Sequence, residues 1–179
     1  MGKRLLGSHV SYLYPESDLV GRGAKSEFTG ITFAGNGQEL DTGAKMVHLA
    51  PDTTSLISTK SISKGGGVSI YRSAVYIDKN AVGSKTSVSC ESLMLDSESR
   101  SDTIPSMVIK TDECDVGHEA KIGRISNDAI FYLMSRGIPE DEARSMIVSG
   151  FANPVSKELP LEYAVEMNNL IRLEMKGNL

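Results

Sequence analysis

Residues 20–125 contain no stretch with a helical hydrophobic period that is long enough for a crossover helix. The region is instead rich in Ser, Thr, Val, Ile and Gly. It is built of short runs in which apolar and polar residues alternate, such as Ser26 to Phe33, Val68 to Ile77 and Thr86 to Leu95. Such alternation is typical of strands, because successive side chains point to opposite faces. The pattern predicts a mainly β fold.

A short pattern that ends in lysine recurs along this β region. It occurs at Gly23-Ala24-Lys25, Gly43-Ala44-Lys45, Gly83-Ser84-Lys85 and Glu119-Ala120-Lys121. The lysines are 20, 40 and 36 positions apart. Intervals near one or two multiples of twenty are typical of a β-solenoid whose turns contribute similar strands. A chance recurrence in a glycine-rich β-sandwich explains the same pattern, so both architectures remain open at this point.

The sequence changes character at Ser126, which is a suitable N-cap for a helix over residues 127–136. Gly137 is the expected end of that helix. Pro139 is suited to the first position of a second helix, which we expect to end at Gly150. The sequence therefore predicts that helices follow the strands.

A third helix is expected after a loop at Asn153-Pro154, from Pro160 to about Lys176. Three helices this short cannot bury enough apolar surface to fold alone, so they should pack on the β unit or on a partner. We expect the chain to divide into a β unit over residues 1–125 and a carboxy-terminal helical domain over residues 126–179.

Composition excludes several classes of protein. The net charge of −4 and the absence of a purely basic segment argue against a nucleic-acid partner. No run approaches the roughly 20 apolar residues of a membrane span, so we expect a cytoplasmic protein with no membrane partner. The two cysteines, Cys90 and Cys114, form no CxxC pair, so one copy of this chain cannot build a four-thiolate zinc or ferredoxin-type site.

Eight segments resemble, in the same order, the carboxy-terminal part of SufB in the SufB/SufD family. They are 43–48 (GAKMVH), 60–67 (KSISKGGG), 90–93 (CESL), 101–105 (SDTIP), 117–120 (GHEA), 131–137 (FYLMSRG), 146–148 (MIV) and 158–166 (ELPLEYAVE). The resemblance covers nearly the whole chain. A single GHEA would mean little, but eight ordered segments are highly specific.

The resemblance implies a right-handed parallel β-helix of the single-stranded solenoid type, followed by a small helical domain. It also implies a non-enzymatic scaffold on which an iron–sulfur cluster is assembled transiently, so that this chain alone would hold none. The implied partners are the ATPase SufC and either SufD or a second SufB-like chain. The chain has no GxxxxGK[ST] phosphate loop, which fits ATP hydrolysis by the partner.

Two features depart from the family pattern. Full-length SufB proteins carry a long region before the segment that matches here, so we expect either a fragment or a short relative. Ser99 stands where some SufB proteins have a cysteine implicated in building the nascent cluster. A serine hydroxyl stays protonated at neutral pH and is a poor iron ligand, so other groups or another chain must supply the ligands.

His118 and Glu119 match the family's proposed cluster ligands, and Cys114 lies four residues earlier. Imidazole and carboxylate are both plausible iron ligands. Neighbouring residues of a regular strand point to opposite faces, however, so His118 and Glu119 can bind one metal only at a strand end or a bulge. The alternative is that His118 is a packed histidine, Glu119 a solvated ion-pair partner and Cys114 an incidental free cysteine.

The start of the third predicted helix carries more apolar side chains than one face can bury, at Leu161, Tyr163, Val165 and Met167. Because the family binds SufC through its helical domain, these four residues are the candidate SufC surface. The alternative is that they pack within the domain. Cys90 and His48 lie in alternating strands and are predicted to be buried and inert.

Two other functions are compatible with a β-helix. A polysaccharide-processing enzyme would need paired acidic residues along one outward face. The acidic candidates fall in predicted turns without a regular face, and they are Glu39, Asp41, Asp96, Glu98 and Asp102. A SufD-like subunit that binds SufC without holding a cluster is supported by Ser99. The GHEA segment favours SufB over SufD.

Overall fold

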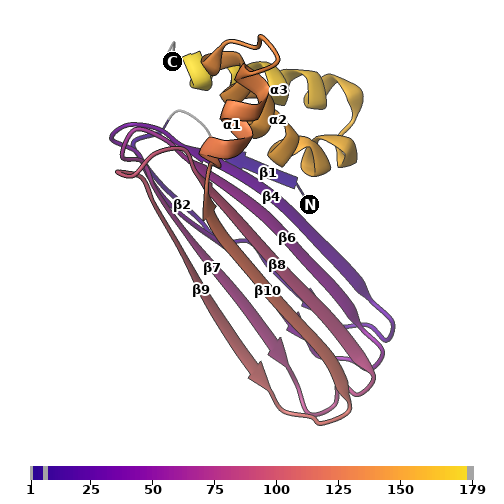
Figure 1. The fold of residues 1–179 in the computed structure, drawn as a ribbon. Coiled ribbons are helices and arrows are strands. Elements are labelled where there is room, and N and C mark those ends of the chain that lie inside the picture. The colour runs from indigo at the N-terminus through magenta and orange to yellow at the C-terminus, as the bar shows by residue number, and fades with distance from the viewer. Residues whose placement is uncertain (1, 6–7, 177–179) are drawn as a thin grey trace.

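The computed structural model describes residues 2–5 and 8–176, and it shows a long parallel β body with three helices at one end (Figure 1). The strands are β1 (Gly2–Leu5), β2 (Val10–Leu13), β3 (Glu16–Leu19), β4 (Lys25–Ala34), β5 (Glu39–His48), β6 (Thr54–Ser63), β7 (Val68–Ile77), β8 (Ser84–Met94), β9 (Arg100–Ile109) and β10 (Cys114–Arg124). The predicted end of the strands, near Ile125, is confirmed.

The strands form two parallel sheets that face each other. Sheet A has the order β1-β4-β6-β8-β10, and sheet B has the order β2-β5-β7-β9, with β3 also paired to β5. The chain alternates between the sheets, so each turn contributes one strand to each, and about four turns stack into a parallel β-solenoid. The solenoid prediction is confirmed and the sandwich is excluded.

The predicted spacing of about twenty residues is wrong. Lys25 of β4 pairs with Thr54 of β6, Thr54 pairs with Lys85 of β8, and Ser84 pairs with Cys114 of β10, which gives turns of 29, 31 and 30 residues. One turn is longer than predicted because it holds two strands of about ten residues and two corners. Lys25 begins a strand of sheet A whereas Lys45 lies within a strand of sheet B, so the recurring lysines are not equivalent.

Columns of stacked side chains fill the interior of the solenoid. Phe28, Ile57 and Val88 occupy successive register positions of β4, β6 and β8, and all three are buried. In the other sheet, Met46 and Val75 stack in the same way. Each turn covers the apolar face of the turn before it, which is how a solenoid builds a continuous core.

The helices are α1 (Asn127–Met134), α2 (Glu140–Glu158) and α3 (Leu161–Lys176). The predicted N-cap is confirmed, since the Ser126 hydroxyl accepts a hydrogen bond from Ala129 N at 3.2 Å. The predicted end of the second helix at Gly150 is wrong, because α2 continues through Pro154. Ala152 and Val155 on its buried face extend the core contact, and this packing outweighs the hydrogen bond that Pro154 cannot donate.

The helices lie on the outer face of sheet A near the carboxyl ends of its strands. One hydrophobic cluster joins Phe33 of β4 and Ile62 of β6 to Val148 of α2 and Met167 of α3. Lys64, in the corner after β6, donates hydrogen bonds from Nζ to the carbonyl groups of Glu174 and Met175 at the end of α3. The helices therefore share a core with the solenoid. Among the described helices, none is long and apolar enough to cross a membrane.

Candidate functional site

The last turn of the solenoid is open. In the described structure β10 pairs only with β8 and β9 pairs only with β7, so each has one free edge (Figure 1). Ile125 N donates to Met94 O of β8. Because backbone groups of a parallel strand alternate sides, the N–H and C=O groups of His118 and Ala120 point to the free edge. Sequence reasoning missed this edge, because the way the turns stack decides which strand of each sheet lies last.

The free edge of β9 differs from that of β10. Arg100 N and Lys110 N donate to carbonyl groups of the β7 turn, so the intervening odd-numbered residues face the free edge of β9. Pro105 is one of these residues, and it has no N–H to donate. The edge of β9 is thus interrupted at its middle, whereas β10 has no proline.

His118 lies on the interior side of β10. Its register partner is Val88, so it continues the column of Phe28, Ile57 and Val88. Val88 is buried because β10 covers it, but His118 is exposed because no further turn follows in the described structure. The imidazole is therefore accessible at the open end of a hydrophobic interior.

Glu119 lies on the opposite face of β10. Its carboxylate accepts an ion pair from Lys121 Nζ at 2.9 Å, and both side chains are exposed. This hydrogen bond and charge raise the pKa of Lys121. The pairing of β10 with β8 continues without a bulge from Cys114 to Arg124. His118 and Glu119 thus lie neither at a strand end nor at a bulge, so they cannot share a metal within one chain.

Cys114 shares the interior side with His118 but begins the strand. Four strand residues separate them by about 13 Å, too far for both side chains to ligate one iron. The half-buried thiol of Cys114 donates to Thr111 O at 3.3 Å. The structure thus does not bring the three candidate ligands together. Among the described residues, no group of three His, Cys, Asp or Glu side chains could hold a metal ion.

Ser99 lies in the corner between β8 and β9, where its hydroxyl accepts a hydrogen bond from Gly66 N at 3.2 Å. Its side chain is buried and supports the corner. The full length of β9, about 30 Å, separates this corner from the one that precedes Cys114. Cys114 therefore cannot replace the cysteine that some SufB proteins carry at the position of Ser99.

Comparison with known proteins assigns the chain to a family. The model of the SufBD core domain of the SUF system of iron–sulfur cluster assembly matches residues 3–151. The chain belongs to the SufBD family. A protein of Staphylococcus aureus strain USA300 and one of Staphylococcus haemolyticus strain JCSC1435, both named iron–sulfur cluster assembly SufBD family proteins, are each 52% identical to it over 174 residues.

These alignments cover 97% of this chain but 37% of each relative. The chain therefore spans just over a third of the length of the curated SufBD relatives that it matches. Members of the family are components of iron–sulfur cluster assembly and generally not catalysts.

The four residues predicted as a partner surface at the start of α3 differ in exposure. Leu161, Tyr163 and Val165 are 76%, 58% and 52% exposed, so the start of α3 carries three exposed apolar side chains. Leu161 and Val165 share one face of the helix, and Tyr163 lies on another. Met167 is 1% exposed and belongs to the core between the helices and sheet A, so its inclusion in that surface was wrong. Met167 and Ile171 lie one turn apart on the face that packs inward, whereas the first turn of α3 lies beyond this contact.

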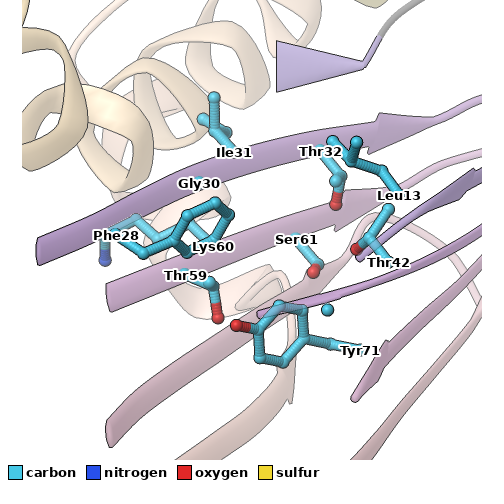
Figure 2. A pocket seen from close by; sticks show the side chains of 11 residues that line it. Leu13, Phe28, Gly30, Ile31, Thr32, Thr42, Thr59, Lys60, Ser61 and Tyr71 are labelled. Carbon is cyan, nitrogen blue, oxygen red and sulfur yellow. The ribbon is translucent and has the colours of Figure 1, made fainter. Parts of the chain in front are cut away.

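The interior of this SufBD solenoid holds a small cavity near Gly30, Thr59, Lys60 and Tyr71 (Figure 2). Its volume of about 20 Å³ accommodates no ligand larger than a water molecule. Burial raises the pKa of the Tyr71 hydroxyl and of the nearby Cys90 thiol, which keeps both groups protonated. The prediction that Cys90 is buried is confirmed.

Proposed function

We propose that this chain is part of a non-enzymatic, cytoplasmic scaffold on which iron–sulfur clusters are assembled as cargo. The open edge of β10 carries the proposal, since it presents His118 at an accessible interior position within a SufBD core domain. Cys114, His118 and Glu119 are the proposed ligands. Because these residues do not converge within one chain, a cluster would need ligands from a second chain.

A second SufB-like or SufD chain is the proposed source of those ligands. The free backbone groups of β10 can pair with an added strand, whereas Pro105 interrupts the edge of β9. β10 runs from Cys114 to Arg124, so its central residue is Glu119. If the equivalent strand of a second chain pairs with it antiparallel, centre to centre, the His118 position of one chain lies two residues along the ladder from the His118 position of the other. Such a pair doubles the number of potential ligands at one place.

The substitution Ala120→Pro tests this arrangement. Ala120 is exposed and its N–H points to the free edge, so proline removes a donor that the isolated chain does not use. We expect the circular dichroism of the isolated chain to be retained, and association with SufD or a second copy to be lost in sedimentation velocity. Undiminished association would show that β10 is not the pairing edge.

Anaerobic reconstitution with iron and sulfide tests the ligands in the complete complex. His118→Ala and Glu119→Ala should preserve the complex but lower the absorption of the assembled cluster, with Lys85→Ala, at an exposed position of the neighbouring strand β8, as the control. If both ligand variants assemble cluster at the wild-type rate, the assignment is wrong. No cluster in the wild-type complex would favour the alternative, a SufD-like structural subunit, which Ser99 supports.

The exposed apolar side chains Leu161, Tyr163 and Val165 at the start of α3 are the proposed contact for the SufC ATPase. These side chains are exposed and do not belong to the core cluster that joins the helices to sheet A, so their replacement should not unfold the solenoid. The double variant Leu161→Ala with Tyr163→Ala should lose co-purification with SufC, whereas Phe131→Ala, an exposed aromatic on α1, should retain it. Capture of SufC at wild-type affinity by the double variant would exclude this surface.

A further inference from the structure

His48 ends β5 at a corner of the solenoid and is completely buried, although its side chain can carry a charge. Its Nδ1 atom lies 2.8 Å from Thr53 Oγ1, and its Nε2 atom lies 2.9 Å from Ser55 Oγ. Two further contacts extend the cluster to β8, from Thr53 Oγ1 to Ser84 Oγ and from Ser55 Oγ to Thr86 Oγ1, both at 2.7 Å. The cluster thus connects sheet B to two successive strands of sheet A.

The hydrogen-bond partners determine where the protons lie. The Thr53 hydroxyl donates its one proton to Ala50 O, so Thr53 Oγ1 must accept from both His48 and Ser84. His48 is therefore protonated on Nδ1, and its Nε2 accepts from the Ser55 hydroxyl. Ser55 in turn accepts from Thr86. In this arrangement the neutral ring uses both nitrogens, and each of the four hydroxyl groups donates its proton once.

A second proton on the ring breaks this arrangement. Protonated Nε2 can only donate, so the Ser55 hydroxyl must turn away from it, and either Ser55 or Thr86 then loses its acceptor. The described structure provides no carboxylate in hydrogen-bonding contact with the ring. The charge would therefore be buried without compensation, which is costly in a protein interior.

The ionisable groups on the surrounding elements do not offset that charge. Asp52 in the adjoining turn is exposed and paired with Arg22, and Asp78 after β7 is bonded to Tyr76 and Asn80. Lys85 of β8 is exposed, and the Cys114 thiol of β10 donates to Thr111 O. The register neighbours of His48 in sheet B are the apolar Leu19 of β3 and Ile77 of β7.

We propose that the His48 cluster is an acid-sensitive lock, in which the neutral ring ties β5 to β6 and β8 and its protonation releases this corner of the solenoid. Burial lowers the pKa of His48 below its ordinary value of 6.5, in agreement with this geometry. Since the unfolded chain binds the proton more readily, the stabilisation is complete above pH 6.5 and decreases as the pH falls below it. This role goes beyond cluster assembly and does not depend on it.

Two-bond ¹H–¹⁵N correlation spectra of the 179-residue chain test the lock directly. We expect the ring of His48 to show the Nδ1–H tautomer and a proton protected from exchange with water, with the exposed rings of His9 and His118 as internal references. The backbone amides between residues 49 and 54 should lose protection when the pH is lowered from 7.5 to 5, where protection is the exchange rate corrected for the intrinsic rate at each pH. An Nε2–H tautomer, or a ring already half protonated at pH 6.5, would overturn the proposal.

Equilibrium unfolding of His48→Gln is the second test. Glutamine retains hydrogen-bonding groups but cannot titrate. Each decrease of one pH unit below pH 6.5 should increase the unfolding constant of the wild type by up to tenfold more than it increases that of His48→Gln. His9→Gln, which changes an exposed histidine, is the matched control and should behave like the wild type. If the unfolding constants of the wild type and His48→Gln depend on pH in the same way, the lock is overturned. If the variant fails to fold, the two-bond correlation spectra of the wild type decide the question.

Discussion

The strands β8 and β10 are both 11 residues long, lie side by side in sheet A and pair in register along their full length. In β8, buried side chains alternate with more exposed ones, whereas nearly all of β10 is exposed. β8 has β6 on one side and β10 on the other, whereas β10 has β8 as its single neighbour among the described strands. The comparison shows that burial in a solenoid is conferred by the neighbouring turns on both sides.

The outer face of sheet A shows the same contrast. The helices cover Phe33, Ile62 and Leu93, which stack in register on β4, β6 and β8. The next position in that column is Gly123 of β10, which has no side chain to contribute. β10 therefore makes no side-chain contact with the helices at this position. Together with its free edge, this leaves β10 available to an external partner.

The largest expected effect comes from placing a charge at equivalent positions of the two strands. Val88→Asp buries an unpaired carboxylate in the filled column and should destabilise the chain by roughly 4 kcal/mol or more, or prevent folding. His118→Asp places the same group at the exposed end of that column and should change the free energy of unfolding by less than about 0.5 kcal/mol. Urea denaturation compares the two variants. Equal losses would mean that β10 is as buried as β8.

An intermediate effect is expected from two ion pairs of sheet A. Lys60 Nζ is buried, pairs with Glu91 at 2.8 Å and lies 4.5 Å from the centre of the Phe151 ring. Glu91→Gln leaves the buried lysine without its counter-charge and should cost about 2 kcal/mol. The matched variant Glu119→Gln on β10 breaks an exposed pair and should cost less than about 1 kcal/mol. Thermal unfolding measures both losses, and equal decreases in melting temperature for the two variants would contradict this prediction.

The smallest effect concerns acid stability in the covered turns of sheet B. Burial acts to raise the pKa of Asp41, but hydrogen bonds from Arg72 and Tyr14 and the charge of Arg72 outweigh it, so the pKa is lowered. The stability that Asp41 contributes is therefore complete above its ordinary pKa of 3.8 and is lost as the pH falls through the lowered value. Asp41→Asn should flatten this part of the unfolding curve.

The matched control for that titration is Asp102→Asn, since Asp102 pairs with Arg100 at 2.6 Å on the edge strand β9. Circular dichroism between pH 5 and pH 2 follows both variants. If Asp41→Asn keeps the acid dependence of the wild type, its ion pair with Arg72 adds no stability.

Much of the fold could be predicted from local patterns. Alternation located the long strands, and Ser126 marked the start of α1. The length of a turn was mispredicted, because lysines at exposed positions carry no information about stacking. The end of α2 was mispredicted because Gly150 and Pro154 break helices locally, whereas burial of the flanking side chains sustains this one.

The sequence by itself determined which side chains of each strand share a face, because a strand alternates with a period of two whatever surrounds it. It thereby predicted that His118 and Glu119 diverge. Only the tertiary structure decided that β10 is the open edge, that Met167 is buried and that Ser99 and Cys114 lie at opposite corners. These properties depend on contacts between residues some thirty or more positions apart, and no local pattern encodes them.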